Sequence, residues 1–333
     1  MTEVIPGIYN LKLPLPEPAT VLGHLNTYLI QGDDGYLLVD TGWNNAETFD
    51  SLKKQLDEIG IKVEDINRIV VTHIHPDHYG LAGRLKQLSG AEITIHQREK
   101  NLIESRYINM DELLQQIARW LHKHGVSQDE LPDLQIASVG MAKFVSPTLP
   151  DVILHGGETI STGTFTLQVL WTPGHSPGHI CLYEPTKKIL LSGDHILPTI
   201  TPNIGLHPQS GANPLGDYIK SLNTIKQLDV NLVLPGHETP FNNLGERIEG
   251  LIRHHKQRNS KILAKIKSEP KTAYQIARGM IWIPDKGGVR WQKLSPLDRR
   301  LALLETVAHI ESMRIEGRIN RFSKDSIIYY QQN

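Results

Sequence analysis

Hydrophobic positions along the first part of the chain follow the periods of strands and helices in turn. Residues 25–42, LNTYLIQGDDGYLLVDTG, contain two short apolar runs around the turn GDDG, a pattern that predicts a β-hairpin. Residues 46–60 carry apolar side chains three and four positions apart and end in glycine, which predicts a helix. The short apolar run at 69–71 then indicates a buried strand.

The alternation continues beyond residue 71. LAGRLKQLSG predicts a helix, and AEITIHQRE predicts the next short strand. Residues 100–145, which include NMDELLQQIARWLHKHG, are instead helical and amphipathic, and we interpret them as an inserted helical cap. After residue 150 the strand pattern returns in TFTLQVLW, KKILLSG and NLVLPG, with a helix at YIKSLNTIKQL before the last of these. Alternating strands and helices without internal repeats predict layered sheets covered by helices.

The last quarter of the chain has a different pattern. From residue 245 onward it is mostly helical, and it ends in GRINRFSKDSIIYY, a hairpin-like pair of short strands. A chain of 333 residues exceeds one average domain. We therefore predict two domains, one of residues 1–244 and one of residues 245–333.

Composition is that of an ordinary globular enzyme, with 39% hydrophobic and 21% charged residues. No apolar run approaches the roughly 20 residues of a membrane helix, and MTEVIPGIYNLKLPLP lacks the order of a secretory signal. Cys181 is the only cysteine, which excludes an intramolecular disulfide and fits a cytoplasmic location. Any metal site must therefore use histidine and aspartate.

The net charge of −1 conceals an asymmetry. Residues 245–333 hold 18 basic and 9 acidic side chains, a net charge of +9, whereas the remainder holds 17 and 27, a net charge of −10. An excess of basic residues in one part of a chain has two readings. It marks a surface that binds nucleic acid or another acidic partner, or it is a solvated basic helix face.

Histidines and aspartates gather where the predicted strands end. THIHPDHYG at 72–80 begins where the run 69–71 ends, and Pro76 and Gly80 place it in a strand-to-helix loop. Buried imidazoles and carboxylates are costly without partners, and a divalent cation satisfies several of them at once. Because loops at one rim of a sheet converge in space, other strand ends supply candidates for the same site. The candidates are His73, His75, Asp77, His78, His175, His179, Asp194, His195 and His237.

Four motifs, THIHPDH, TPGHSPGH, LLSGDHIL and LPGH, occur in this order and resemble those of the metallo-β-lactamase superfamily of hydrolases over residues 8–240. The resemblance implies an α/β fold of the αββα sandwich type, here with a helical insertion at about 100–145. It also implies two sets of metal ligands and one shared carboxylate. The first set is His73, His75 and His175, the second is Asp77, His78 and His237, and Asp194 is the carboxylate that bridges both metals.

Two dications a few ångströms apart repel, and a shared anionic ligand together with a bridging hydroxide offsets the repulsion. Nitrogen and oxygen ligands suit zinc, and they suit iron or manganese equally. Zinc is favoured because the implied chemistry is non-redox and because the flavodiiron branch usually carries glutamate where this sequence has His75. The resemblance implies hydroxide as the nucleophile, with Asp77 and Asp194 as the catalytic carboxylates and Asp77 orienting the hydroxide.

Other residues near the strand ends have two readings each. Asp40 in VDTG resembles a buried aspartate that supports the ligands in this family, and a turn-stabilising role is the alternative. His179 and His195 adjoin predicted ligands without matching one, so we expect them to support the site or the fold. His24 faces the pocket or lies in a surface loop, and TPNIG at 201–205 is expected to form a pocket wall.

Aromatic residues and further histidines are expected to be structural. Trp120, Trp171 and Tyr107 are expected to pack in the core. The histidines expected to be solvated helix residues are His122, His124, His254 and His255.

The order helix, helix and basic hairpin after residue 270 resembles a winged-helix domain, as found in the branch of the superfamily that includes the lactamase-B-like endoribonuclease. One reading is that this domain binds RNA or DNA, with affinity that falls as salt rises. The favoured reading is that it packs on the hydrolase and closes one side of the pocket or a homodimer interface, since no aromatic-rich RNA-reading motif is present.

The sequence thus predicts a cytoplasmic dinuclear metallohydrolase that cleaves a small ester, thioester or lactone, because the site suits carbonyl chemistry and the cap encloses a small pocket. The alternative is a nucleic-acid-processing phosphodiesterase with the basic C-terminal domain as a clamp. A binding protein without activity is disfavoured by the retention of all predicted ligands.

Overall fold

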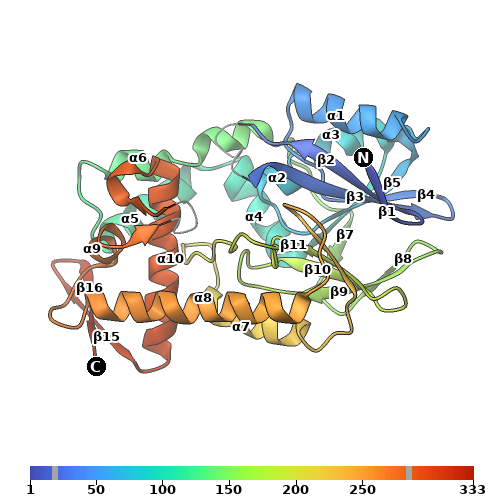
Figure 1. Ribbon diagram of the computed structural model, residues 1–333. Coiled ribbons are helices and arrows are strands. Elements are labelled where there is room, and N and C mark those ends of the chain that lie inside the picture. The colour runs from blue at the N-terminus through green and yellow to red at the C-terminus, as the bar shows by residue number, and fades with distance from the viewer. Residues whose placement is uncertain (17–21, 283–286) are drawn as a thin grey trace.

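Two β-sheets packed face to face form the centre of the hydrolase part of the protein (Figure 1). The computed structural model describes residues 1–16, 22–282 and 287–333. Within these residues the first sheet follows the order of the chain: β1 (Thr2–Ile5), β2 (Ile8–Pro14), β3 (His24–Gly32), β4 (Gly35–Val39), β5 (Ile66–Val71), β6 (Glu92–His96) and β7 (Val152–Leu154). Pairs from β1 to β4 are antiparallel, and pairs from β4 to β7 are parallel.

The second sheet is mixed in direction. Its described strands lie in the order β12 (Leu232–Pro235), β11 (Ile189–Gly193), β10 (Ile180–Glu184), β9 (Thr166–Trp171) and β8 (Thr159–Ser161). Only β11 and β12 among these neighbours are parallel. A parallel pair needs a long crossover connection, and α7 (Pro214–Ile225) provides it.

Alternation of side chains along each strand produces three layers of apolar core. In β5, Ile69 and Val71 pack in the cluster beneath the outer helices, whereas Val70 faces the other sheet. In β10, Leu182 faces the first sheet and Cys181 faces outward. Because successive side chains of a strand point to opposite faces, strands buried on both sides read as the continuous apolar runs seen in the sequence.

Helices cover both outer faces of the two sheets. The helices α1 (Ala46–Asp57) and α3 (Ala82–Ser89) lie over the first sheet, and α7 with α8 (Leu244–Lys265) lies against the second (Figure 1). The side chain of Asn45 caps α1 by accepting a hydrogen bond from the backbone N–H of Thr48 over 2.7 Å. The predicted αββα sandwich is confirmed.

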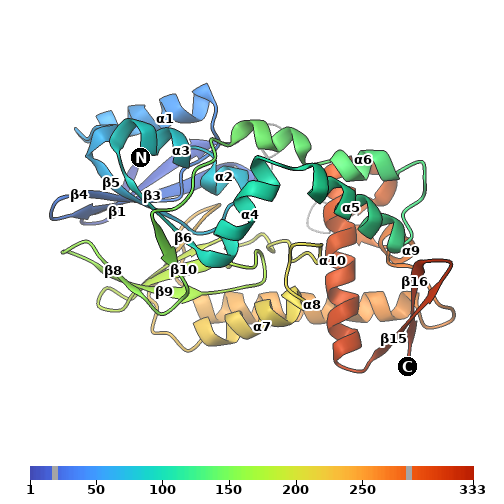
Figure 2. The same cartoon turned by 180° about the vertical axis from the view of Figure 1, so that it is seen from behind.

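The insertion at 100–145 is helical as predicted, but its parts contact different neighbours. It comprises α4 (Gln97–Tyr107), α5 (Asp111–Lys123), α6 (Leu131–Ile136) and the 3₁₀ helix η3 (Val139–Phe144). The end of α4 reaches the loop after β5, where the Tyr107 hydroxyl donates to the carbonyl of Ile74. By contrast, α5 and α6 pack into a core formed with the C-terminal segment (Figure 2).

The C-terminal segment builds a second core of its own with those two helices. Its described elements are α8, α9 (Ala273–Arg278), β13 (Ile281–Trp282), β14 (Val289–Arg290), the 3₁₀ helix η5 (Trp291–Lys293), α10 (Pro296–Ile315), β15 (Ile319–Lys324) and β16 (Ile327–Gln332). The terminal hairpin β15–β16 is antiparallel, and Lys271 pairs with Tyr330 beside it. The winged-helix assignment and the division at residue 245 stay predictions.

Some sequence expectations about single side chains were wrong. His124 and His255 were expected to be solvated, but they are only 5% and 3% exposed, because His124 packs beside Tyr330 and His255 beside His309. Trp171 was expected in the core, but it is 40% exposed at the end of β9. None of the described helices combines the length and apolar character that crossing a membrane requires.

Candidate metal centre

The predicted site residues follow four strands whose ends meet at one edge of the sandwich. They come after β5, which ends at Val71, after β9 at Trp171, after β11 at Gly193 and after β12 at Pro235. All seven residues predicted as ligands belong to three overlapping groups whose ligand atoms lie within 4.8 Å of one another. The groups are His73, His75 and His175; His73, His78 and Asp194; and Asp77, His78 and His237.

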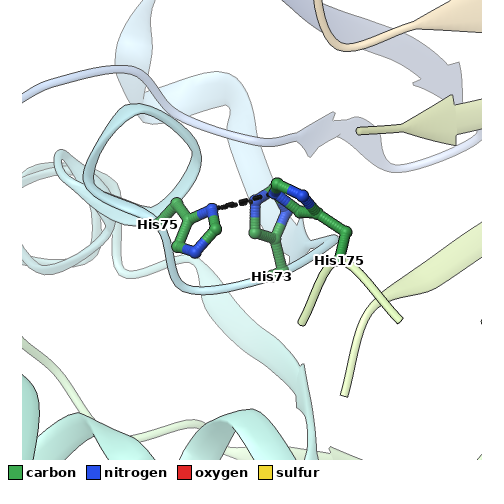
Figure 3. A group of neighbouring side chains, drawn as sticks. All are labelled: His73, His75 and His175. Carbon is green, nitrogen blue, oxygen red and sulfur yellow. Dashed lines mark hydrogen bonds between the residues drawn. The ribbon is translucent and has the colours of Figure 1, made fainter. Parts of the chain in front are cut away.

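Three imidazoles converge in the first group (Figure 3). The Nδ1 atom of His75 lies 2.9 Å from Nε2 of His73 and 3.0 Å from Nε2 of His175. Ligand nitrogens around one tetrahedral zinc ion lie about 3.3 Å apart. The spacing of the three nitrogens is therefore close to that of one metal-binding face.

Hydrogen bonds behind the ring of His175 decide which of its nitrogens faces the centre. Its Nδ1 lies 2.9 Å from the carbonyl oxygen of Asn203, which accepts only, so Nδ1 carries the proton. Nε2 then presents a lone pair toward His75. For His73, Nδ1 lies 3.1 Å from the hydroxyl of Thr72, which itself donates to Asp40, so the same argument leaves the lone pair on Nε2.

His78 is oriented by the carboxylate of Asp40. Its Nδ1 donates to Oδ2 of Asp40 over 2.7 Å, and Thr72 donates to the same carboxylate through its backbone N–H and its hydroxyl. Asp40 adopts the left-handed backbone conformation, with φ of 63°, directly after β4. Asp40 therefore contacts a predicted ligand, as the resemblance implied, and does more than stabilise the turn after β4.

His237 is held in the same way from the opposite side. Its Nδ1 lies 2.8 Å from the carbonyl oxygen of His24, which leaves the lone pair on Nε2. The preceding Gly236 lies against Asp194, since a Cβ there would fall 2.6 Å from the carboxylate oxygen. Only glycine lets the loop after β12 approach this closely. His24 thus contributes its backbone to the site.

Asp194 lies between the two sets of ligands. Its Oδ1 is 3.4 Å from Nε2 of His78 and 3.5 Å from Nε2 of His237, whereas its Oδ2 is 3.7 Å from Nε2 of His175. Each oxygen of one carboxylate thus faces a different set. This is the arrangement expected of a carboxylate shared by two cations.

Asp77 completes the second set. Its Oδ2 lies 3.3 Å from Nε2 of His237 and 3.9 Å from Nε2 of His78. Although burial opposes the shift, the nearby imidazoles of His78 and His237 lower the pKa of Asp77 to about 2. Asp77 is therefore an anion across the neutral pH range.

Charge divides the histidines of the site into two kinds. Burial, reinforced by neighbouring imidazoles, lowers the pKa of His73 and His75 well below the usual value, so both are neutral at pH 7. Although burial opposes it, the carboxylates of Asp194, Asp40 and Asp77 raise the pKa of His78 well above the usual value. An excess of negative charge thus surrounds His78, and a bound metal cation would neutralise it.

The predicted ligands fit divalent cations, because several of their buried nitrogen and oxygen atoms have no hydrogen-bond partner among the described residues. Among the described residues, His78 Nε2, Asp194 Oδ1 and His237 Nε2 are buried without a hydrogen-bond partner, and they face one another. A buried polar atom without a partner is costly, and a coordinated cation removes that cost for all three. Imidazole nitrogens and carboxylate oxygens are ligands for zinc, iron and manganese alike.

His179 and His195 lie behind the predicted ligands. Nε2 of His179 accepts a hydrogen bond from the backbone N–H of Asp194 over 3.2 Å, and its Nδ1 lies 2.8 Å from the Thr172 hydroxyl. His179 therefore positions the backbone of Asp194. His195 packs its ring edge-on against Tyr218, with ring centroids 5.0 Å apart.

Sequence reasoning missed Glu99, a buried carboxylate in α4. Its Oε2 accepts from the backbone N–H of Ile74 over 3.0 Å, and its Oε1 accepts from Gly178 over 2.7 Å. One side chain thus ties the loop after β5 to the loop after β9. The sequence signal was weak, since a glutamate in a helix is usually exposed.

The C-terminal helices hold the loop after β11 through residues that the sequence analysis did not single out. The backbone N–H of Leu206 donates to the carbonyl of Leu304 in α10 over 3.0 Å. Glu305, one residue further, accepts from the side chain of Asn203 over 3.5 Å and pairs with Arg258 of α8 over 3.1 Å. The carbonyl that orients His175 therefore belongs to a residue fixed by this C-terminal ion pair.

Arg247 in α8 supports the same loop at its beginning. Its guanidinium donates to the carbonyls of Leu197, Thr199 and Ile200 over 2.6, 3.2 and 2.6 Å. Together with α10, it fixes the segment that follows Asp194.

Comparison with known proteins agrees with the fold. The sequence model described as the metallo-beta-lactamase superfamily matches residues 21–237. The chain belongs to this superfamily, and it is a metal-dependent hydrolase.

Three relatives illustrate the match. The chain is 26% identical to the probable metallo-hydrolase YqjP of Bacillus subtilis (strain 168), over 96% of this chain and 97% of that protein. It is 30% identical to the acyl-coenzyme A thioesterase MBLAC2 of Homo sapiens, over 65% of this chain and 74% of that protein. A crystal structure of a metallo-beta-lactamase family protein from Thermus thermophilus matches with a TM-score of 0.85 and 30% identity, over 99% of this chain and 100% of that chain.

Proposed function

We propose that the protein hydrolyses a small ester, thioester or lactone at a centre of two divalent ions, with zinc as the favoured metal. The observation that carries this proposal is the position of Asp194, whose two oxygens face different sets of imidazoles. On this proposal His73, His75 and His175 would hold one ion, Asp77, His78 and His237 would hold the other, and Asp194 would be a ligand of both.

The ions would supply Lewis acidity, which lowers the pKa of water and polarises a carbonyl oxygen. The chain supplies everything else. Asp40 holds the proton of His78 on Nδ1, and the Asn203 carbonyl holds that of His175 on Nδ1, so both rings present Nε2. The Oδ2 atom of Asp77 faces His237 and would hold an ion, so Asp77, an anion at neutral pH, would orient a water molecule and accept its proton at Oδ1.

A thioester is the ester type best supported. The human relative is named an acyl-coenzyme A thioesterase, and it is 30% identical to this chain. Thioesters are also carbonyl substrates without a charged scissile group, which suits a site whose donors already include the carboxylates of Asp77 and Asp194. We place the activity in the cytoplasm, which the single cysteine, Cys181, supports.

A phosphodiesterase acting on nucleic acid is the second candidate. It is favoured by the net charge of +9 in residues 245–333. Binding of RNA at two salt concentrations tests it, because neutralised phosphates release counterions and the affinity falls steeply with salt.

A substrate panel distinguishes these functions. Purified protein is assayed with acyl thioesters, lactones and a bis-phosphodiester, before and after chelation and after zinc is restored. We expect thioester turnover that chelation abolishes and zinc restores. Asp77→Asn should lose at least about 100-fold in kcat, whereas Asp50→Asn, on the exposed face of α1, should match the wild type. Turnover of the phosphodiester alone, or activity unaffected by Asp77→Asn, would refute the proposal.

A further inference from the structure

A cluster of two arginines and one histidine lies beside the metal centre, and the proposed chemistry leaves it unexplained. It consists of Arg106 at the end of α4, Arg300 in the first turns of α10, and His207 in the loop after β11. Three separate parts of the chain, namely the insertion, the C-terminal segment and the hydrolase core, each contribute one member. Figure 2 shows α4 between the first sheet and the α5–α6 pair that packs on α10.

The three side chains lie near one another, since Arg106 donates to the side chain of Gln209 and the backbone N–H of Gln209 donates to His207. Burial, followed by the charges of Arg106 and Arg300, lowers the pKa of His207 to about 3. Burial and the charge of Arg106 lower the pKa of Arg300 to about 10. Tyr107, the residue after Arg106, donates its hydroxyl hydrogen to the carbonyl of Ile74, which lies between His73 and His75, so the end of α4 lies next to the predicted metal ligands.

Both guanidinium groups have only neutral partners among the described residues. Arg106 donates from Nε to the side-chain oxygen of Gln209 over 2.9 Å, and no described carboxylate lies within ion-pair distance of it. Arg300 donates to the carbonyls of Leu134 and Gln135 and to the hydroxyl of Ser138. These acceptors cap the end of α6, so Arg300 has a structural task as well.

Arg106 and His207 retain donors that no described residue satisfies. The Nη atoms of Arg106 make no hydrogen bond within the described ranges. The Nδ1 atom of His207 accepts from the backbone N–H of Gln209 over 3.2 Å, so the ring proton is on Nε2. A half-buried charge without a counter-charge is costly, and a bound anion is the usual remedy.

An open cavity connects His207 with the metal centre. The cavity has a volume of about 200 Å³ and is lined by His175, Ser176, His207, Arg98 and Trp171. The cavity thus extends from His175, a predicted metal ligand, to His207, the histidine of the cluster. The guanidinium of Arg98, the one arginine of the described lining, lies 4.8 Å above the ring of Trp171. The one acidic residue of the described lining is Asp217.

We propose that the substrate carries an anionic group, a phosphate or a carboxylate, which binds Arg106 and His207 while the scissile carbonyl lies at the metal centre. This inference rests on the proposed function and narrows its substrate class. Arginine suits the task because its planar fork binds the oxygens of carboxylate or phosphate in pairs. Neutral esters and lactones should then be poor substrates.

Matched substrates test the proposal. One pair is the butyryl thioesters of pantetheine and of 4′-phosphopantetheine, which differ by one phosphate on the leaving half. The other pair is pentanoyl and glutaryl N-acetylcysteamine, in which a carboxylate is added to the acyl half. The zinc-loaded full chain is compared with Arg106→Gln, with the charge-retaining Arg106→Lys, and with Arg119→Gln, an exposed control on α5.

We expect the anionic member of one pair to have a higher kcat/KM, mainly through KM, by about tenfold or more. Arg106→Gln should remove this preference by lowering kcat/KM for the anionic member toward that for the neutral one. Arg106→Lys should keep part of the preference, and Arg119→Gln all of it. Equal rates within both pairs for the wild type would overturn the proposal. So would an Arg106→Gln variant that slows both members equally, because that result indicates a structural role.

Binding separates this inference from the proposed hydrolysis. S-butyl thioethers of pantetheine and of 4′-phosphopantetheine cannot be hydrolysed, and their affinity is measured by calorimetry. If no thioester is turned over but the phosphorylated thioether binds about tenfold tighter, and loses this advantage in Arg106→Gln, the proposed function fails and the anion site stands. Equal binding of the two thioethers, or binding of neither, with no preference in turnover, would remove the anion site.

Discussion

The carboxylate of Asp40 accepts a hydrogen bond from Nδ1 of His78 over 2.7 Å, at a position where the backbone of Asp40 is left-handed. The same carboxylate accepts two donors of Thr72, the residue that begins the loop of predicted ligands. One aspartate thus fixes both a side chain and the start of its loop. In metal sites such partners orient a ligand and strengthen its basicity.

Asp40→Asn should weaken metal binding without unfolding the chain. Asparagine tolerates the left-handed conformation, but it lacks the negative charge that holds the proton of His78 on Nδ1. We expect an affinity loss of about 10- to 100-fold for one of the two ions. Competition with a chromophoric chelator measures it, with Asp50→Asn as control. Unchanged affinity would mean that Asp40 only shapes the turn.

Glu99→Gln should loosen the two ligand loops relative to each other. Glutamine offers one acceptor oxygen where Ile74 and Gly178 present two donors, so one buried N–H meets the amide NH₂ group. The expected loss is about 1–3 kcal/mol in the free energy of unfolding. Denaturant unfolding checks it beside Glu104→Gln, an exposed change in the same helix. Equal stability of the two variants would show that Glu99 does not hold the two loops together.

The ion pair of Arg258 and Glu305 should show the asymmetry of buried charges. Arg258→Met leaves the Glu305 carboxylate buried without its cation. We expect the free energy of unfolding to fall by about 3–5 kcal/mol. The double variant Arg258→Met/Glu305→Leu should recover much of this loss, since no charge then remains buried. The exposed ion pair of Lys226 and Glu249 serves as comparison. Lys226→Met should lower the free energy of unfolding by about 1 kcal/mol or less. A double variant as unstable as the single one would show that the packing of Arg258 matters more than its charge.

Acid should destabilise the C-terminal core through His124. Burial lowers the pKa of this imidazole in the folded chain to about 4, whereas the unfolded value is about 6.5. The unfolded state therefore binds the proton first, so stability is complete above about pH 6.5 and falls as the pH decreases toward 4. At pH 5 the imidazole of His124 lowers the free energy of unfolding by about 2 kcal/mol relative to neutral pH. His124→Phe should flatten the acid side of the stability profile and the exposed His122→Gln should not; two identical profiles would contradict this assignment.

The sequence predicts the sandwich and the convergence of the predicted ligands because both follow from local patterns. Strands such as β5 and β10 are buried on both faces, which gives apolar runs, and loops at their ends share one edge. The strands β1 and β2 were not predicted, since their apolar pattern is short and is interrupted by Pro6 and Gly7.

What the sequence could not predict depends on contacts between distant segments. His124 and His255 look like exposed helix residues until α5 and α8 are seen to pack on α10 and β16. Glu99 resembles a surface glutamate until two backbone donors from separate loops are placed beside it. Burial of a polar side chain is fixed by its tertiary partners, and periodicity along one helix does not reveal them.

The most direct test is the number of metal ions bound per chain. Protein purified without chelator and reconstituted with zinc is analysed by inductively coupled plasma mass spectrometry, together with Asp194→Asn. We predict about two ions per wild-type chain, and fewer in the variant, because the shared carboxylate is the only predicted ligand of both ions. A wild-type chain that binds no stoichiometric metal, or an Asp194→Asn chain that binds two ions as tightly, would contradict the dinuclear centre.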